Sequence, residues 1–220
     1  MTKKAPLIAV SALVILSGCA GQKQLPNAYD KYKPLVEFVK STDTCQEIAD
    51  SLFNRVNDVR KKYHIPSLSR NESLVDMAVS HSVEMGVNFF LGHEDYTGRD
   101  LGQRAKSFGI EYYYIGENCN ASFLSCIPLD KEKNIYYVQD MTTMFDNIVN
   151  GWVNSPTHFY NMVDTTFTMT DIGVYVFFDT VCYHEEITPT FEYVNKCCKI
   201  FVTQLFLRPP ERNMNYFDSF

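Results

Sequence analysis

Three polar stretches of this chain contain residue types that can do chemistry. A histidine, His158, follows a Ser-Pro turn just after an apolar-periodic segment that ends at Trp152, the only tryptophan. A helix ending at that turn would place His158 in a cleft rather than in the core. His93, in a Gly-His-Glu-Asp stretch, and Glu117, in a Gly-Glu-Asn stretch, offer polar groups that could meet it. We therefore predict that two imidazoles and one carboxylate converge on one solvent-accessible cleft.

The composition favours one compact domain with extensions. The chain has 220 residues, of which 45% are hydrophobic, and it contains 16 Phe and 14 Tyr. This length and apolar content can bury a sizeable core, and the aromatic residues argue against disorder. The formal net charge is −6, and no cluster of Lys and Arg alternates with aromatic residues. These features argue against a nucleic-acid partner.

The first residues are typical of an export signal rather than of the folded domain. Lys3 and Lys4 precede an apolar run at residues 5–16, which is too short to span a bilayer comfortably. The run ends in Leu-Ser-Gly-Cys, which resembles the bacterial lipobox that is cleaved before its cysteine. We expect residues 1–18 to be a lipoprotein signal peptide and Cys19 to carry fatty acyl groups such as palmitate. The chain would then be an extracytoplasmic lipoprotein of the bacterial cell envelope, anchored to the membrane. The alternative is an ordinary secretory signal with an incidental cysteine.

Export changes how the other cysteines are interpreted. An even number of cysteines in an exported domain favours disulfides, although six allow 15 pairings. Our first predicted bridge joins Cys119 to Cys126, and the second joins Cys182 to Cys197 or Cys198. No Cys-x-x-Cys spacing exists, which argues against a zinc site made of cysteines. With Cys19 committed to lipid, the six that remain are Cys45, Cys119, Cys126, Cys182, Cys197 and Cys198.

The periodicity predicts helices first and strands later. Residues 19–43 are polar and rich in turn formers, so we expect a tether there, followed by a domain at 44–208 and a tail at 209–220. A capping box at Thr44 and Glu47 should begin the first helix. We expect a loop from residue 119 to about 134, and antiparallel strands at 172–178 and 199–206. This order predicts an α+β fold. Predicted helices span 44–63, 74–86, 100–108 and 141–152.

An ordered set of short motifs resembles the CAP superfamily, also called the SCP or cysteine-rich secretory protein domain. The resemblance covers roughly residues 45–206. Each motif alone is weak, but their order is specific. The motifs are Asn-Asp-Val-Arg at 57–60, Ile-Pro-Ser-Leu at 65–68, the helical segment 78–85, Phe-Leu-Gly-His at 90–93, Gly-Glu-Asn at 116–118, Trp-Val-Asn-Ser-Pro-Thr-His at 152–158, and the closing strands at 172–174 and 203–206.

The resemblance implies a three-layer α-β-α sandwich with a central antiparallel sheet, and a cleft lined by histidines and glutamates. By position, the cleft residues would be His93, Glu117 and His158. The family's second glutamate falls at Ser155, which carries no charge. Two neutral imidazoles can bind a divalent transition metal such as zinc, and a nearby carboxylate orients a ring or accepts a hydrogen bond from bound water. His93 and His158 would be the metal ligands.

Other interpretations of these residues stay open. His93 and His158 can also be loop histidines satisfied by backbone groups. His81 is more typical of a partly buried packing histidine, and Trp152 of a core anchor. His64 and His184 are expected to face solvent.

Three functions follow from this interpretation. The first is a binding module whose cleft takes an apolar or cell-envelope ligand, favoured because no recognisable motif places a nucleophile beside a histidine with an orienting acid. The second is a metal-assisted hydrolase with Glu117 as general base, or with Ser155 as nucleophile and His158 as base. The third is a structural envelope protein with a vestigial cleft.

Overall fold

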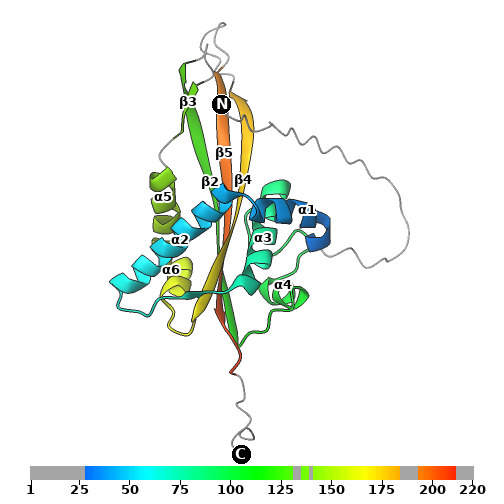
Figure 1. Ribbon diagram of the computed structural model, residues 1–220, viewed down its shortest axis with the longest axis vertical. Helices are drawn as coiled ribbons and strands as arrows, with labels where there is room; N and C mark the ends of the chain where they lie inside the picture. Colours follow the sequence, from blue (N-terminus) through cyan, green and yellow to red (C-terminus); the bar gives the residue numbers. More distant parts are fainter. Residues whose placement is uncertain (1–27, 131–134, 139–140, 184–192, 212–220) are drawn as a thin grey trace, which may run out of the picture.

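The computed structural model describes residues 28–130, 135–138, 141–183 and 193–211. Helices cover both faces of a sheet built from long strands (Figure 1). The α+β class and the three-layer α-β-α sandwich are therefore confirmed. The predicted signal peptide, Cys19 and His184 lie outside the described residues.

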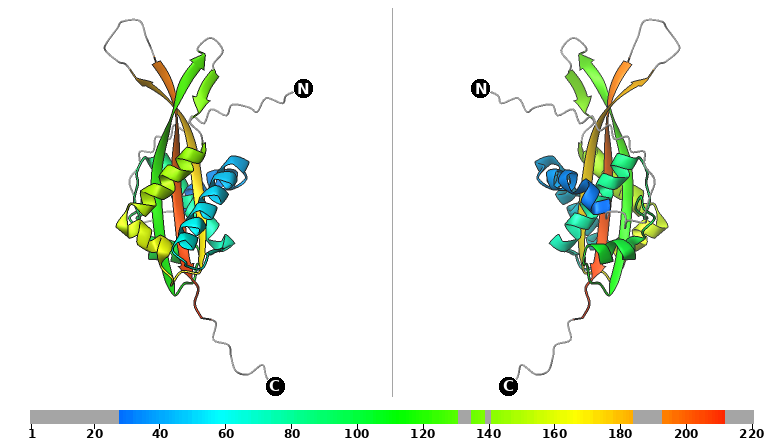
Figure 2. Two further views of the ribbon diagram at one scale, coloured as in Figure 1. Left: turned by 90° about the vertical axis from the view of Figure 1, so that its left-hand side faces the viewer. Right: turned by 90° about the vertical axis from the view of Figure 1, so that its right-hand side faces the viewer.

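The sheet has five strands in the order β1-β4-β5-β2-β3. Long strands β4, β5 and β2 pair antiparallel, as does β3 with β2, whereas the two-residue β1 pairs parallel with β4. The predicted antiparallel pair at 172–178 and 199–206 lies within β4 and β5, so it is confirmed. At one end the long strands run beyond the helices (Figure 2). The bounds are β1 Ser69–Arg70, β2 Tyr114–Asp130, β3 Ile135–Val138, β4 Met169–Tyr183 and β5 Tyr193–Arg208.

Strand β2 corrects two predictions. The loop expected from residue 119 begins inside this 17-residue strand, which pairs with β5. Cys119 and Cys126 both lie on β2, seven residues apart, so the extended backbone separates their Cα atoms by roughly 23 Å. A disulfide needs Cα atoms within about 7 Å, so the predicted bridge is wrong. Cys119 is a free, buried thiol, as is Cys45.

The register of β4 and β5 also gives no support to the second predicted bridge. Cys182 is paired with Val194, whereas Cys197 is paired with Asp179. The offset of three residues along the strands corresponds to about 10 Å, which exceeds the reach of a disulfide.

The helices form two layers. Helices α3 and α4 lie on one face of the sheet, and α2, α5 and α6 lie on the other (Figure 1). All four predicted helices match observed ones to within two residues at each end. Helix α6 was not predicted. The bounds are α2 Asp43–Lys62, α3 Val75–Asn88 after a short 3₁₀ turn at Glu72–Leu74, α4 Leu101–Ser107, α5 Met141–Val153 and α6 Pro156–Val163.

The folded part begins earlier than the sequence suggested. Residues Ala28–Lys40 form helix α1 inside the predicted tether. Val36 and Val39 of α1 are buried in the main core, and the Tyr32 hydroxyl is hydrogen-bonded with the Asn88 side chain at the end of α3. The predicted capping box is also wrong, because α2 begins one residue earlier behind Thr42, which makes no side-chain cap.

Helix α3 packs unusually close to the sheet. A Cβ atom at Gly173 on β4 would lie 2.2 Å from the backbone of Ala78 and Val79. Only glycine accommodates this contact, which lets α3 bring its inward side chains directly onto the strands. His81 is one of those inward side chains.

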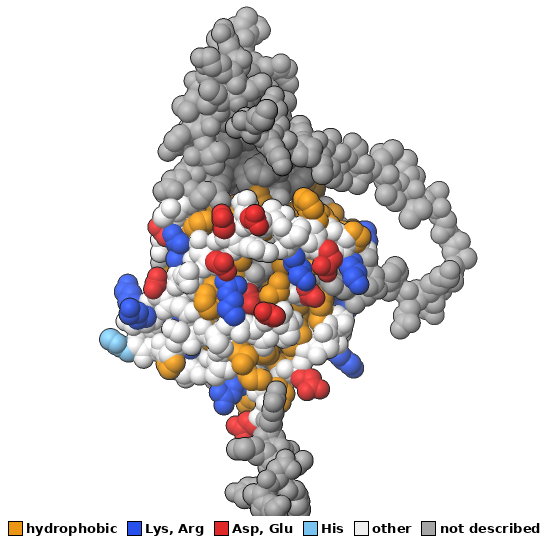
Figure 3. All heavy atoms as spheres, viewed as in Figure 1, with side chains coloured by type: hydrophobic (Ala, Val, Ile, Leu, Met, Phe, Trp, Pro, Cys, Tyr) orange, Lys and Arg blue, Asp and Glu red, His pale blue; other side chains and the backbone are white. Residues whose placement is uncertain are grey.

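The surface carries mixed charge. On the face seen in Figure 3, acidic and basic side chains intermingle rather than forming a continuous basic area. Within the described residues, no helix combines the length and the apolar character needed to cross a membrane.

Candidate functional site

The connection between α3 and α4 places His93 against strand β2. The His93 Nδ1 atom lies 2.9 Å from Oε1 of Glu117. The Glu117 side chain is only 1% exposed, whereas that of His93 is 57% exposed. Glu117 is therefore a buried support, and His93 presents its ring to solvent. An open pocket borders this ring, lined by residues 90 and 92–96.

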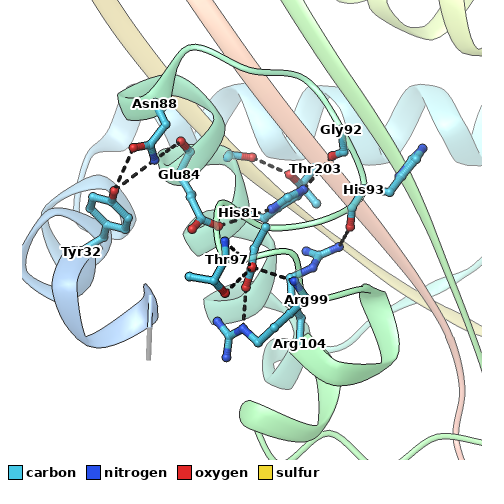
Figure 4. Close-up of polar contacts among 12 residues, drawn as sticks. Tyr32, His81, Glu84, Asn88, Gly92, His93, Thr97, Arg99, Arg104 and Thr203 are labelled. Carbon is cyan, nitrogen blue, oxygen red and sulfur yellow. Dashed lines mark hydrogen bonds and ion pairs between the residues drawn. The ribbon is translucent and has the colours of Figure 1, made fainter. Parts of the chain in front are cut away.

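Arg104 is a site residue that the sequence did not reveal. Asp100 begins α4 with a capping box, and Arg104 follows one turn later. Its Nη2 atom donates to Glu117 Oε2 at 2.7 Å. The same atom donates to the His93 carbonyl oxygen at 2.8 Å (Figure 4). The same guanidinium thus fixes the carboxylate and the backbone of the histidine. No sequence pattern signals its burial, because a lone arginine on a short helix is usually solvated.

Helix α6 brings the second histidine to the site. Pro156 occupies its first turn, where a missing N–H costs nothing, so a new helix starts where a turn alone was expected. The rings of His93 and His158 have centroids 6.3 Å apart and planes tilted by 55°. The structure thus brings His93, Glu117 and His158 together, as the sequence predicted.

Hydrogen bonds of two asparagines link α6 to the edge of β2 that does not pair with β5. Asn161 Nδ2 donates to the carbonyl oxygen of Glu117 and to Asn118 Oδ1. Asn118 Nδ2 in turn donates to the carbonyl oxygen of His158. Further along β2, the Trp152 indole N–H donates to the carbonyl oxygen of Cys119. Asn161 and Trp152 thus satisfy strand carbonyls that β3 does not reach, and Asn118 ties the backbone of His158 to the strand.

The electrostatics of the site separate the two histidines. The hydrogen bond that His93 donates to Glu117 raises the pKa of His93 despite partial burial. Burial, followed by the nearby charge of His93, lowers the pKa of His158. Burial alone would raise the pKa of Glu117, but the hydrogen bond from His93 and the charge of Arg104 outweigh it, so this pKa is lowered. An ionised Glu117, a readily protonated His93 and a neutral His158 result.

Ser155 does not join this network through its hydroxyl. It occupies the N-cap position of α6 without a side-chain cap, and its Oγ lies 3.4 Å from Thr157 Oγ1. Among the hydrogen bonds of the described residues, none joins Ser155 Oγ to a histidine nitrogen. The proposed serine nucleophile therefore finds no support in the geometry.

The two neighbouring acids do not supply the missing carboxylate either. Asp95 is buried, but it organises its own loop by accepting hydrogen bonds from Thr97 and Arg99. Glu94 is exposed.

The cleft histidines fit a zinc ion only poorly. A tetrahedral zinc holding two imidazoles brings their ring centroids to roughly 5 Å, since each Zn–N bond is about 2.1 Å. The observed 6.3 Å is longer. Two imidazoles alone also make a weak site, because Ser155 stands where a second carboxylate would be expected.

His81 and Cys119 lie beneath the cleft. His81 is buried, as expected of a packing histidine, and its Nε2 lies 2.9 Å from the Gly92 carbonyl oxygen. The Cys119 Sγ atom lies 3.9 Å from His93 Nδ1. Burial raises the pKa of the Cys119 thiol well above its usual value, so the free thiol is a poor nucleophile.

Comparison with known proteins agrees with the fold and the site order. A model of the cysteine-rich secretory protein family (CAP) matches residues 53–182. No curated protein matches the sequence. An extracellular protein containing an SCP domain from Bacillus anthracis shares 21% identity with a TM-score of 0.50, over 87% of this chain and 45% of that protein. An outer surface protein of Borrelia burgdorferi shares 21% identity with a TM-score of 0.49, over 76% of this chain and 96% of that one.

The chain thus spans less than half of the Bacillus anthracis protein, and that likeness shows the fold alone. The family match, in contrast, covers more than half of the chain and contains His93, Glu117 and His158. The chain therefore belongs to the cysteine-rich secretory protein (CAP) family.

Proposed function

We propose that this CAP domain is an extracytoplasmic binding module, held at the membrane by acylated Cys19, whose cleft binds a polar ligand of the cell envelope. The observation that carries the proposal is the contrast between an exposed His93 ring and its fully buried support, Glu117. A ring held in one orientation before the ligand arrives loses little freedom on binding.

The charges of the site favour recognition over hydrolysis. Glu117 is a weak candidate for a general base, because its pKa is lowered and both its oxygens already accept hydrogen bonds. His93, whose pKa is raised, and His158, whose pKa is lowered, instead offer a more readily and a less readily protonated ring side by side. Such a pair suits a ligand that carries both an anionic group and a hydrogen-bond donor, as peptidoglycan fragments do with their carboxylates and hydroxyls.

The binding test uses calorimetry with soluble peptidoglycan fragments and, separately, with phospholipid vesicles. We expect saturable binding of the fragments, weakened at least about tenfold, or 1.4 kcal/mol, by either His93→Asn or His158→Asn. His64→Asn is the matched control, because His64 is exposed away from the site and asparagine tolerates its left-handed backbone (φ 58°). A folded protein that binds neither probe would refute the proposal.

The anchor is tested independently of the cleft. An alkyne-tagged fatty acid supplied to bacteria expressing the full chain should label the wild type and leave Cys19→Ser unlabelled. Labelling of Cys19→Ser equal to that of the wild type would rule out acylation at Cys19.

A further inference from the structure

A second group of ligand-type side chains lies below the cleft, in the space between α3 and β2. One ligand atom each from His81, Glu117 and Cys119 lies within 4.8 Å of the others, and all three residues are buried. Glu117 and Cys119 are two residues apart on β2, so they point to the same face of the sheet. Helix α3 lies over that face at the close distance that Gly173 permits, which brings His81 to them.

We propose that this buried group is a metal site for zinc or a similar divalent transition metal, with Cys119, Glu117 and His81 as ligands and His93 as the fourth donor. Thiolate, imidazole and carboxylate are the ligand types that zinc takes in proteins. The site goes beyond the proposed ligand-binding role of the cleft, although it shares His93 and Glu117 with the cleft.

The distances within the group are close to those of a closed site. His93 Nδ1 lies 2.9 Å from Glu117 Oε1 and 3.9 Å from Cys119 Sγ. Two ligands on one zinc are roughly 3–4 Å apart, given bonds of about 2.0–2.3 Å. The ligand atom of His81 lies within 4.8 Å of those of Glu117 and Cys119.

The surroundings of the group resemble the outer contacts of a metal site. Arg104 donates to Glu117 Oε2, which orients the carboxylate and leaves Oε1 on the side of His93. A ligating imidazole commonly donates its other N–H to a carbonyl oxygen, and Gly92 offers one to His81 Nε2. His81 Nδ1 has no hydrogen-bond partner although it is buried. The nearby Glu84 Oε2 lies 3.9 Å from that nitrogen, which is beyond hydrogen-bond distance.

Charge balance also permits a cation here. Binding takes Cys119 as thiolate, so one proton leaves the thiol for solvent as the metal–sulfur bond forms. The thiolate and the Glu117 carboxylate then offset the two charges of the ion, and Arg104 keeps its contact with Glu117. The buried Glu84 also faces the group, with its Oε2 3.9 Å from His81 Nδ1. His93 belongs both to this set and to the histidine pair at the cleft mouth, whereas His158 belongs to the pair alone.

Cobalt(II) distinguishes the two locations, because a thiolate ligand adds a charge-transfer band in the near ultraviolet. The reduced, chelator-stripped full chain is titrated with Co²⁺ alone. We expect one equivalent to bind with that band and with the strong visible absorption of a tetrahedral site. Cys119→Ser should abolish the charge-transfer band, and His81→Asn should weaken binding at least about tenfold.

Two variants serve as matched controls. Cys45→Ser removes the other described free thiol, and His158→Asn removes the cleft ring outside the set. Both should retain the band. The proposal is overturned if the wild type binds no Co²⁺, if it binds without the band, or if Cys119→Ser keeps the band. Should Cys119→Ser not fold, the ¹¹³Cd chemical shift of the wild type decides, since one sulfur ligand is expected and none would contradict the site.

Discussion

Arg104 and Glu117 form an ion pair that is buried on both sides. Nη2 of Arg104 lies 2.7 Å from Oε2 of Glu117, and the two side chains are 3% and 1% exposed. A pair of this kind contributes little net stability compared with apolar side chains of the same size, but removing one partner leaves the other charge buried alone. Its observed role is positional, because the same guanidinium also holds the carbonyl oxygen of His93.

Neutralising the carboxylate should therefore destabilise the fold. We expect Glu117→Gln to lower the free energy of unfolding by about 3–5 kcal/mol, because Arg104 loses its counter-ion. Urea unfolding followed by circular dichroism measures this. Glu94→Gln, a neighbouring exposed acid, should change it by less than about 0.5 kcal/mol. Equal effects of the two substitutions would contradict a buried, paired Glu117.

The two cleft histidines should titrate on opposite sides of the ordinary value of 6.5. In chelator-treated protein, ring-proton NMR should give His93 a pKa above 6.5 and His158 one below it. Glu117→Gln should bring the pKa of His93 down, because its largest cause is the hydrogen bond to that carboxylate. An unchanged His93 titration in this variant would rule that cause out.

The directions of the two pKa shifts determine how each histidine changes the free energy of unfolding with pH. The contribution of His93 is fully present below pH 6.5 and is lost as the pH rises through its folded pKa. The contribution of His158 is present above pH 6.5 and is lost as the pH falls through its lowered pKa. Unfolding of His93→Asn and His158→Asn at several pH values should show these opposite trends, and parallel trends would contradict them.

The link between α6 and β2 should depend on Asn161. Asn161→Ala removes the donor to the carbonyl oxygen of Glu117 and to Asn118 Oδ1, both on a buried stretch of strand. We expect a loss of about 1–3 kcal/mol and a changed chemical shift of the His158 ring. Asn154→Ala, at an exposed position just after the end of α5, is the control and should change neither quantity.

Helix α1 should behave as part of the domain rather than as a tether. Val36 is fully buried, whereas Phe38 on the same helix is 59% exposed. Val36→Ala should lower the free energy of unfolding by about 2 kcal/mol, and Phe38→Ala should leave it nearly unchanged. If α1 were only a tether, neither substitution would change the free energy of unfolding. Calorimetric unfolding of the two variants measures this.

The sequence predicted the elements whose apolar periodicity is regular, which are α2 to α5 and the core of β4 and β5. It missed those whose signals conflict. Pro34 interrupts the pattern of α1, yet the helix forms because Val36 and Val39 reach the core. Burial of the apolar face outweighs the local cost of the proline there.

Strand β2 was missed for a related reason. The Gly-Glu-Asn motif at 116–118 is typical of a turn, because glutamate and asparagine are poor residues for a buried strand. Partners from distant parts of the chain make that strand possible: Arg104 and His93 satisfy Glu117, and Asn161 satisfies Asn118. Such partners cannot be read from local sequence. His93, Glu117 and His158 were found because their spacing follows a family pattern, whereas Arg104 follows none that we recognised.

Trp152 gives the cleft a built-in optical probe. It is the only tryptophan of the chain, it is 1% exposed, and its indole N–H is bonded to the carbonyl oxygen of Cys119. Its emission should therefore be blue-shifted in the native protein and should change in intensity when an absorbing ion such as Co²⁺ occupies the space beside Cys119. The fluorescence of Trp152 would therefore report when an ion binds beside Cys119, with no label attached to the chain.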